Sequence, residues 1–380
     1  MTANLDTRSV ESPGATEIFI TSTPQENAPL QDQAREIFAG ISEILRVRDA
    51  SILQERIFST QAAAETLRKA RAQVYGEIDD GVTPSFLVAA EGSSGPIAGV
   101  QVHAVSGGKP EVIQLDANPC GRIFRSPRCS YLTLSYISVA GILPAFRGRD
   151  ALDTNEAADQ AKAMMETAQA VLKKYGVDFL SVPRTWMWLK DILSWYDDFN
   201  HVRTKFFTEW GLVGAGTRQS MPASTGIGLG PANGGHCAMD LTAVLEPADS
   251  TQYLQAAGKQ QCAMEYGSAF SRASKAITPA GHTVFVSGTA SINTDGQTTN
   301  IGDAAGQIKA TIENVRAVLG NMNCGDEDVV HVIAYCKTTE IEKVFKAYKD
   351  TLNWPWITVI CDICRPDLLF EIEATAMPKN

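Results

Sequence analysis

The sequence predicts an α+β protein in which about three degenerate copies of one unit each pack a sheet against helices. One helical pattern occurs three times, a strand-like run precedes each occurrence, and further strands and a second helix follow it. The 380 residues are enough for three units of about 90–100 residues each. A content of 44% hydrophobic and 20% charged residues is ordinary for a soluble globular protein.

The three helical segments share their length and their apolar stripe. They read "QAREIFAGISEIL" from Gln33, "QAKAMMETAQAVL" from Gln160 and "QIKATIENVRAVL" from Gln307. Each segment ends on Leu, and apolar or small residues fall at matching positions in between. Because this spacing forms one face of a helix, the pattern predicts three equivalent amphipathic helices.

Strand-like runs and a second helix surround each of these helices in the same order. In the first copy we expect strands at 15–21, 56–60, 85–91 and 97–105, with the second helix at 62–76. In the middle copy we expect strands at 130–139, 179–185, 221–228 and 237–245, with the second helix at 195–210. In the third copy we expect strands at 282–292, 329–337, 356–363 and 368–376, with the second helix at 340–352.

These elements divide the chain into units and connecting segments. We expect a flexible tail at 1–14, a first unit plus linker at 15–127, a middle unit at 128–246, a linking segment at 247–280 and a third unit at 281–380. The tail has neither the apolar core nor the cleavage pattern of a signal peptide, so we expect a cytoplasmic protein.

Charge and cysteine usage exclude several classes of partner. The net charge of −10 argues against nucleic acid and anionic membranes, and no apolar run approaches the ~20 residues of a membrane span. The eight cysteines are scattered and are expected to be reduced. Cys361 and Cys364 have the CxxC spacing of a zinc site, but no second CxxC and no histidine pair accompanies them, so we expect neither a metal nor a cofactor.

Two acidic residues stand in the last predicted strand, "LLFEIEATA". Side chains alternate along a strand, so Glu371 and Glu373 face one way and Phe370 and Ile372 the other. That face is either simply solvated or directs an acid at a ligand. The matching strands read "VQVHAV" and "AMDLTA", with apolar or amide residues where Glu371 stands, and this difference favours a function.

Arginines beside aromatic residues mark a second candidate region. Arg184 at the end of a predicted strand and Arg203 in a predicted helix have Trp188 and other aromatic residues around them. A flat, carboxylated ring is bound by such residues, because guanidinium groups pair with carboxylates and rings cover apolar faces. An aromatic helix packed into the core is the alternative. The segment "EYGSAFSRAS", 265–274, is either a ligand-binding loop or only a turn.

The third copy resembles the RidA/YjgF family of small trimeric proteins, and the whole chain resembles the chorismatases, of which 3-hydroxybenzoate synthases are one branch. The segments that carry this resemblance are "RTWMWLKDI", "YDDFNHVRTKFF", "MPASTGIG", "YGSAFSRA" and "CRPDLLFEIEA". The resemblance implies RidA/YjgF-like (chorismate-mutase-like) units that form an internal pseudo-trimer. It also implies either a monomer or a homo-oligomer, with chorismate as its small-molecule partner.

The resemblance further implies which residues act. Glu371 matches the catalytic glutamate that protonates the enolpyruvyl ether of chorismate, and Glu373 is expected to be structural. The implied substrate-binding residues are Arg184, Trp188, Arg203, Tyr266, Ser271, Arg272, Ala273 and Cys364. Protonation makes an oxocarbenium ion, which loses pyruvate after attack by water or by the hydroxyl of the ring.

The products and two other functions stay open at this point. The possible products are 3-hydroxybenzoate, 4-hydroxybenzoate and a dihydroxycyclohexadienoate. By the resemblance Cys364 favours hydroxybenzoate and Ala273 disfavours it, and we favour 3-hydroxybenzoate. The alternatives are a RidA-like imine or enamine deaminase and a sensor that binds chorismate without converting it.

Overall fold

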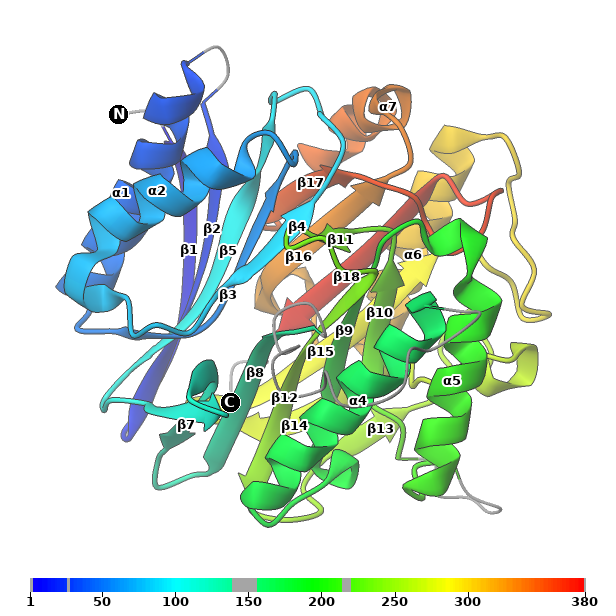
Figure 1. Cartoon of the computed structure of the whole chain (residues 1–380). Coiled ribbons are helices and arrows are strands. Elements are labelled where there is room, and N and C mark those ends of the chain that lie inside the picture. The colour runs from blue at the N-terminus through cyan, green and yellow to red at the C-terminus, as the bar shows by residue number, and fades with distance from the viewer. Residues whose placement is uncertain (1–2, 26–27, 139–155, 214–219, 379–380) are drawn as a thin grey trace.

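The computed structural model describes residues 3–25, 28–138, 156–213 and 220–378. Its strands form three six-stranded sheets, one for each predicted copy, with helices on one face of each sheet (Figure 1). The prediction of an α+β protein built from repeated units is confirmed.

The first sheet has the strand order β1-β2-β5-β3-β4-β11. Its sixth strand, β11, is a two-residue segment from the middle copy. The elements of the first copy are β1 (Ala3–Ser12), β2 (Ala15–Pro24), α1 (Leu30–Val47), β3 (Ser51–Ser59), α2 (Ala64–Tyr75), β4 (Ser85–Val88) and β5 (Ile97–Ser106).

The second sheet has the order β10-β9-β12-β8-β7-β6. Its first helix has acidic residues in the first turn and lysines in the last, which suits the helix dipole. The elements are β6 (Glu111–Leu115), β7 (Asn118–Arg125), β8 (Ser130–Ile137), α4 (Glu156–Lys174), β9 (Arg184–Leu189), α5 (Tyr196–Glu209), β10 (Ala223–Ile227), β11 (Gly230–Pro231) and β12 (Cys237–Glu246).

The third sheet has the order β13-β14-β15-β18-β16-β17. Both of its helices begin at a side-chain cap, because Asp303 accepts a hydrogen bond from the Gly306 amide and Thr338 accepts one from the Ile341 amide. The elements are β13 (Gln252–Leu254), β14 (Ala273–Thr278), β15 (Gly281–Ala290), α6 (Ala304–Asn321), β16 (Val329–Cys336), α7 (Thr339–Lys349), β17 (Trp356–Ile360) and β18 (Phe370–Ala376).

The strands of the three sheets correspond by their place in the order. Strands β2, β8 and β15 each pair with the last strand of their copy, which is β5, β12 or β18. Strands β3, β9 and β16 flank that last strand on its other side, and β4, β10 and β17 run parallel to them. The helices α2, α5 and α7 lead into these parallel strands.

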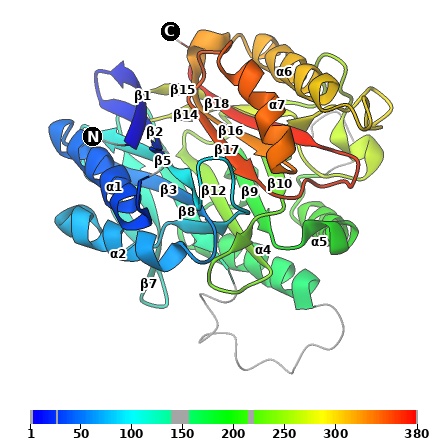
Figure 2. The same cartoon turned by 90° about the horizontal axis from the view of Figure 1, so that it is seen from above.

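The central strands of the three sheets are buried on both faces. Each outer face packs against the helices of its own copy and forms a separate core. The inner faces of the three sheets meet around one shared core (Figure 2). All three sheets contribute aromatic side chains to this core, such as Phe58, Trp188 and Tyr335. Strands covered on both sides carry long apolar runs, which explains their strong signal in the sequence.

The expected flexible tail at 1–14 is wrong for the part that the structure describes. Residues 3–12 form β1, which pairs along its whole length with β2, while residues 1–2 lie outside the described residues. The segment carries few apolar residues because β1 is an edge strand with one face at the surface. Val10 packs against a small buried cluster of Phe19, Ala280, Val330 and Met377, and Arg8 pairs with Asp6.

The expected connecting segments also contain strands. The Gly- and Pro-containing stretch at 106–127 holds β6 and β7, which belong to the second sheet, and 247–280 holds β13 and β14 of the third. These strands are short or polar, so backbone pairing with a neighbouring strand decides their structure rather than an apolar pattern.

Another difference concerns the strand expected at 179–185. Residues Phe179–Ser181 form a 3-10 turn, and β9 begins at Arg184, directly after Pro183. Proline has no amide hydrogen to give to a sheet and therefore suits the position just before a strand. None of the helices in the described part of the chain combines the length and apolar character that a bilayer crossing requires.

Candidate active site

Glu371 lies in the middle of the third sheet, on its inner face. Strand β18 places it beside Ala290 of β15 and Tyr335 of β16. Its exposed fraction is 4%, and that of Glu373 is 5%. The interpretation of this face as a solvated surface is therefore wrong, and both carboxyl groups need partners inside the protein.

The carboxyl group of Glu371 is present in one copy of the repeat. The residue opposite Tyr335 is Glu371, the residue opposite Trp188 is Ala238, and the residue opposite Phe58 is Gly99. In the first copy the position equivalent to Glu371 is thus Gly99. The sequence analysis had matched Glu371 to the segment "VQVHAV", which begins one residue later, at Val100. The other two copies have no side-chain acid at this position.

Glu373 is fully engaged by the second copy. Arg184 donates to its Oε2 atom at 2.9 Å, and the Trp186 indole donates to its Oε1 atom at 2.9 Å. Arg184 also donates to Thr225 at 2.7 Å, and burial lowers its pKa to about 10. This ion pair joins β9 to β18 and fixes the distance between the second and third sheets at Glu371.

A small cavity of about 50 Å³ opens beside Glu371, between the second and third sheets. The second copy contributes α5 and β10 to its wall, and the third contributes β15, β18 and the segments before β14 and β18. Its lining residues are Tyr196, Arg203, Ser224, Gly226, Tyr266, Ser268, Phe270, Arg272, Gly288, Ala290, Ile292, Cys364, Arg365 and Glu371.

Three arginines give this cavity its positive charge. Arg203 is buried on α5, where its Nη2 atom donates to Asn200 at 2.6 Å and its Nε atom has no hydrogen-bond partner among the described residues. Burial lowers the pKa of Arg203. Arg272 donates to the Tyr266 hydroxyl at 2.6 Å, and Arg365 donates to the Gly296 carbonyl at 2.6 Å.

Aromatic rings lie beside these cations. The guanidinium carbons of Arg272 and Arg365 stand 5.4 and 5.3 Å from the centre of the Tyr266 ring. Phe270 lies 5.6 Å from Arg203 and 5.4 Å from Arg272. The site therefore combines apolar ring faces with cationic donors, and this combination suits a planar ligand that carries carboxylates.

The environment of Glu371 favours its neutral form. Burial and, next in size, the nearby Glu373 carboxylate raise the pKa of Glu371 to about 8, against the opposing effect of Arg184, Arg272 and Arg365. Burial also raises the pKa of the Cys364 thiol to about 12. At neutral pH the cavity thus holds a protonated carboxylic acid and a protonated thiol among arginine side chains.

Gly288 makes room for the Glu371 side chain. A Cβ atom at this position of β15 would lie 2.1 Å from Oε1 of Glu371 and 3.2 Å from a methyl carbon of Thr225. The Gly288 amide donates to the Thr225 hydroxyl at 3.0 Å. A glycine is required here because the carboxyl group occupies the space of a side chain.

Five of the predicted site residues come together in the cavity wall. They belong to α5, to the segment before β14 and to the segment that ends in β18: Arg203, Tyr266, Arg272, Cys364 and Glu371. Residues distant in sequence meet here because the second and third sheets face each other.

The other four predicted substrate-binding residues do not line the cavity. Arg184 is held by Glu373 and Thr225, and the Trp188 ring packs edge-on against Phe58 in the shared core. Ser271 donates to the Met221 carbonyl at 2.6 Å. Ala273 is buried in the core between the third sheet and its helices. In each case a neighbouring copy or the outer core covers the side chain, which the sequence pattern does not reveal.

Sequence analysis missed Arg365 as a site residue. It stands next to Cys364 in the segment "CRPDLLFEIEA", which was singled out, and its position beside that predicted site residue was the available signal. Tyr196, one of the aromatic residues near Arg203 in the sequence, was not singled out as a site residue either. Gly288 carries no side-chain signal, so its role is visible only in three dimensions.

Several known proteins are similar to parts of this chain. Residues 265–378 match the family model described as Endoribonuclease L-PSP. A 3-hydroxybenzoate synthase from Streptomyces hygroscopicus is 26% identical over 255 residues, which are 59% of this chain and 71% of that protein. A YjgF family member from Neisseria meningitidis is 17% identical and covers 34% of this chain and 96% of its own, with a TM-score of 0.27.

The whole chain also matches a solved structure. A crystal structure of a chorismatase covers 99% of this chain and 99% of its own, with a TM-score of 0.61 and 18% identity. The resemblance stated from the sequence is thereby confirmed: this chain has the fold of that chorismatase, is similar to a 3-hydroxybenzoate synthase, and carries an Endoribonuclease L-PSP segment in its third copy.

Proposed function

We propose that this protein is a chorismatase that cleaves the enolpyruvyl ether of chorismate by acid catalysis and releases pyruvate. The observation that carries the proposal is a buried carboxyl group, Glu371, with a pKa raised to about 8 in the wall of a cavity lined by three arginines. The similarity to a 3-hydroxybenzoate synthase supports the same conclusion.

Glu371 is the proton donor in this mechanism. It transfers its proton to the terminal methylene carbon of the enolpyruvyl group, which becomes the methyl group of an oxocarbenium ion. Carbon is a poor base, so the donor must hold its proton at neutral pH and stand close to the reacting atom. A buried carboxylic acid with a raised pKa meets the first requirement, as in other enzymes that use neutral acids.

The arginines bind the two carboxylates of the substrate. Arg203, Arg272 and Arg365 surround the cavity, and each has a planar guanidinium that pairs with a carboxylate. Their charge also balances the carboxylate that Glu371 becomes after proton transfer. Arg184 is assigned here to holding Glu373, not to the substrate.

Admission of chorismate requires the cavity to widen. Its volume is about 50 Å³, whereas small-molecule sites occupy roughly 300–1,000 Å³. Tyr266 and Phe270 lie on the segment before β14, and we expect their side chains to move when the substrate enters. Arg272, which donates to the Tyr266 hydroxyl, already lines the cavity together with Glu371.

We favour 3-hydroxybenzoate as the product. In that reaction the ring hydroxyl, not water, displaces the pyruvyl group, and chorismate is converted to hydroxybenzoate and pyruvate without consuming water. The closed, aromatic-lined cavity favours this outcome because it restricts the access of water to the oxocarbenium ion. Hydrolysis would instead consume one water and leave a dihydroxycyclohexadienoate. The third possible product is 4-hydroxybenzoate, and chromatography separates all three.

The test is incubation of the purified protein and of its Glu371→Gln variant with chorismate, with pyruvate measured and the ring products separated by chromatography. We expect pyruvate from the wild type and a rate reduced about 10²–10⁴-fold in the variant. A wild-type protein that binds chorismate, as seen by a higher melting temperature, but releases no pyruvate would contradict the proposal and indicate a sensor. Release of ammonia from imine substrates without pyruvate release would indicate a deaminase.

A further inference from the structure

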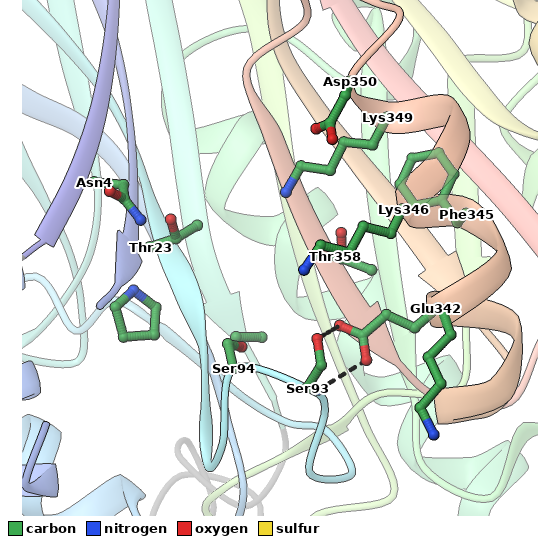
Figure 3. Close-up of a pocket in the computed structure, with 13 residues that line it drawn as sticks. Asn4, Thr23, Ser93, Ser94, Glu342, Phe345, Lys346, Lys349, Asp350 and Thr358 are labelled. Carbon is green, nitrogen blue, oxygen red and sulfur yellow. Dashed lines mark hydrogen bonds between the residues drawn. The ribbon is translucent and has the colours of Figure 1, made fainter. Parts of the chain in front are cut away.

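A second and larger cavity lies between the third sheet and the first (Figure 3). Its volume is about 260 Å³. Its wall is formed by α7 and β17 of the third copy and by β1, β2, β5 and the segment before β5 of the first copy. The lining residues are Asn4, Thr23, Pro24, Ser93, Ser94, Ala98, Glu342, Lys343, Phe345, Lys346, Lys349, Asp350 and Thr358.

This cavity occupies the position that corresponds to the Glu371 cavity in the repeat. There, α5 and β10 of one copy face β15 and β18 of the next; here, α7 and β17 face β2 and β5. The position of Glu371 is taken by Gly99 in the first copy, so the acid of the proposed reaction has no counterpart in this second cavity. What the second cavity can do is therefore binding rather than acid catalysis.

Lysines of α7 give the second cavity its positive charge, and Lys343, Lys346 and Lys349 line it. Lys346 and Lys349 stand three residues apart on α7, and Figure 3 shows their amino groups extending from the helix toward the first copy. Neither amino group has a hydrogen bond or ion pair with any residue in the described part of the chain. Lys349 is partly buried, and this burial lowers the pKa of its amino group.

The acidic residues in the wall do not pair with these lysines. Glu342 is committed to the first copy, where it accepts hydrogen bonds from the Ser93 amide and from the Ser93 hydroxyl, both at 2.8 Å. Asp350 is exposed at the end of α7. The wall therefore holds three lysines and two carboxylates, so it keeps a net positive charge, which attracts an anion.

The neutral lining residues indicate what kind of anion fits. The hydroxyl groups of Thr23, Ser94 and Thr358 and the amide of Asn4 are hydrogen-bonding groups around the rim, and Phe345 adds an apolar surface. A single inorganic ion would leave most of a cavity of about 260 Å³ empty. A carbon skeleton with two carboxylates would use both lysines, the hydroxyl groups and the apolar wall.

We propose that the cavity between α7 and β2 is a second ligand site, which binds a small organic dicarboxylate through Lys346 and Lys349. This site is separate from the Glu371 cavity, and its existence does not depend on the proposed reaction.

The proposal is tested by calorimetric titration with benzene-1,3-dicarboxylate at constant ionic strength. The proteins compared are the wild type, a Lys346→Gln/Lys349→Gln variant and a Lys205→Gln/Lys309→Gln variant. The last is a matched control, because it removes the same charge from positions on α5 and α6 that lie outside the cavity. We expect the lysine-cavity variant to raise the dissociation constant at least about tenfold, since two charge-assisted contacts are lost, and the control to leave it nearly unchanged.

Two further measurements make the result specific. An Arg272→Gln variant weakens binding in the Glu371 cavity, and we expect its titration to retain the lysine-dependent binding event. A crystal soaked with the dicarboxylate is expected to show it between Lys346 and Lys349, which tests the site even if a variant fails to fold. Binding that is lost in Arg272→Gln but kept in the lysine-cavity variant would overturn the proposal. So would inorganic phosphate of equal affinity, or no binding by the wild type at millimolar concentrations.

Discussion

At the scale of single residues, the proposed activity depends on the different surroundings of two neighbouring glutamates, Glu371 and Glu373. Glu373 is held by Arg184 and Trp186, whereas Glu371 stands at the cavity, where burial raises its pKa to about 8. The two side chains share one strand face, yet one is structural and the other is available for chemistry. The difference arises from which side chains of the second sheet reach each carboxyl group.

The raised pKa of Glu371 predicts a dependence of activity on pH. The proposed reaction requires the protonated acid, so we expect the rate to fall as the pH rises through about 8. The measurement is the pH profile of kcat/KM for pyruvate release, which reports the pKa values of the free enzyme. A rate that instead rises between pH 7 and 9 would show that the ionised carboxylate is the active form.

The same shift predicts a dependence of stability on pH. The folded protein keeps the Glu371 proton up to about pH 8, whereas the unfolded chain releases it near the ordinary value of 4.5. The stability that this group contributes is therefore complete below about pH 4.5 and decreases as the pH rises toward 8. We expect the melting temperature of wild type relative to Glu371→Gln to fall across this window. Equal pH profiles for the two proteins would contradict the shift.

Arg365 is predicted to bind substrate. Replacement by Lys keeps the charge but removes the planar pair of donors, so we expect KM for chorismate to rise about tenfold or more with little change in melting temperature. Arg316→Lys is the control, because Arg316 pairs with Asp326 at the surface, away from the cavity. An unchanged KM in Arg365→Lys would remove Arg365 from the site.

At the scale of elements, the site depends on how strands β15 and β18 pack side by side. The Glu371 carboxyl group lies over Gly288 of β15, in space that any other residue would fill. The helices contribute in a different way: α5 brings Arg203 to the cavity, and its neighbours Phe199 and Phe206 anchor the helix in the outer core. One strand pair thus places the acid, and one helix places a cation opposite it.

A Gly288→Ala substitution tests this packing. The added methyl group would displace the Glu371 carboxyl group, and misplacement of a reacting group by about 1 Å can cost about 10²-fold in rate. We expect a loss of that size in pyruvate release. Gly320→Ala is the control: nothing lies within 4 Å of its Cβ position on α6, so we expect unchanged activity and about 0.5–1 kcal/mol of added stability. Full activity in Gly288→Ala would show that the Glu371 carboxyl group does not need the space beside Gly288.

At the scale of the whole molecule, buried polar groups join the three sheets at each of their interfaces. Arg56 of the first copy pairs with Asp240 of the second at 2.8 Å. Arg184 of the second pairs with Glu373 of the third. Glu17 of the first accepts hydrogen bonds from Thr278 and from the Ala280 amide of the third. These links set the relative positions of the sheets, and with them the two cavities between copies.

The Arg56–Asp240 ion pair is predicted to stabilise the folded protein only when both partners are present. Asp240→Asn leaves the buried Arg56 cation without its counter-charge, and we expect a loss of about 3–5 kcal/mol in the free energy of unfolding, measured by denaturant titration. In Arg56→Met/Asp240→Asn no unpaired charge remains, while the introduced side-chain amide can still accept from Ser85 and from the Tyr136 amide through its oxygen, so much of the loss should be recovered. A double variant as unstable as the single one would show that the ion pair itself is not the cause.

The sequence by itself determined the repeat, the order of strands and helices in each copy and the candidate acid. These features depend on local periodicity and on a carboxylate that stands in one copy of a repeated strand, and both are visible in the order of residues. The short or polar strands β1, β6 and β13 were missed, because pairing with a neighbouring strand, and not their own composition, makes them strands.

Only the tertiary structure decided which residues share the cavity. Four residues were predicted from the sequence to bind the substrate, but other parts of the protein cover their side chains. They are Arg184, Trp188, Ser271 and Ala273. The different surroundings of Glu371 and Glu373 also result from contacts with the second sheet. Contacts between copies set burial, partners and pKa, and the two residues of the Arg184–Glu373 pair are 189 positions apart in the chain. Such contacts leave no local pattern, so they follow from the packing of the three sheets around one core.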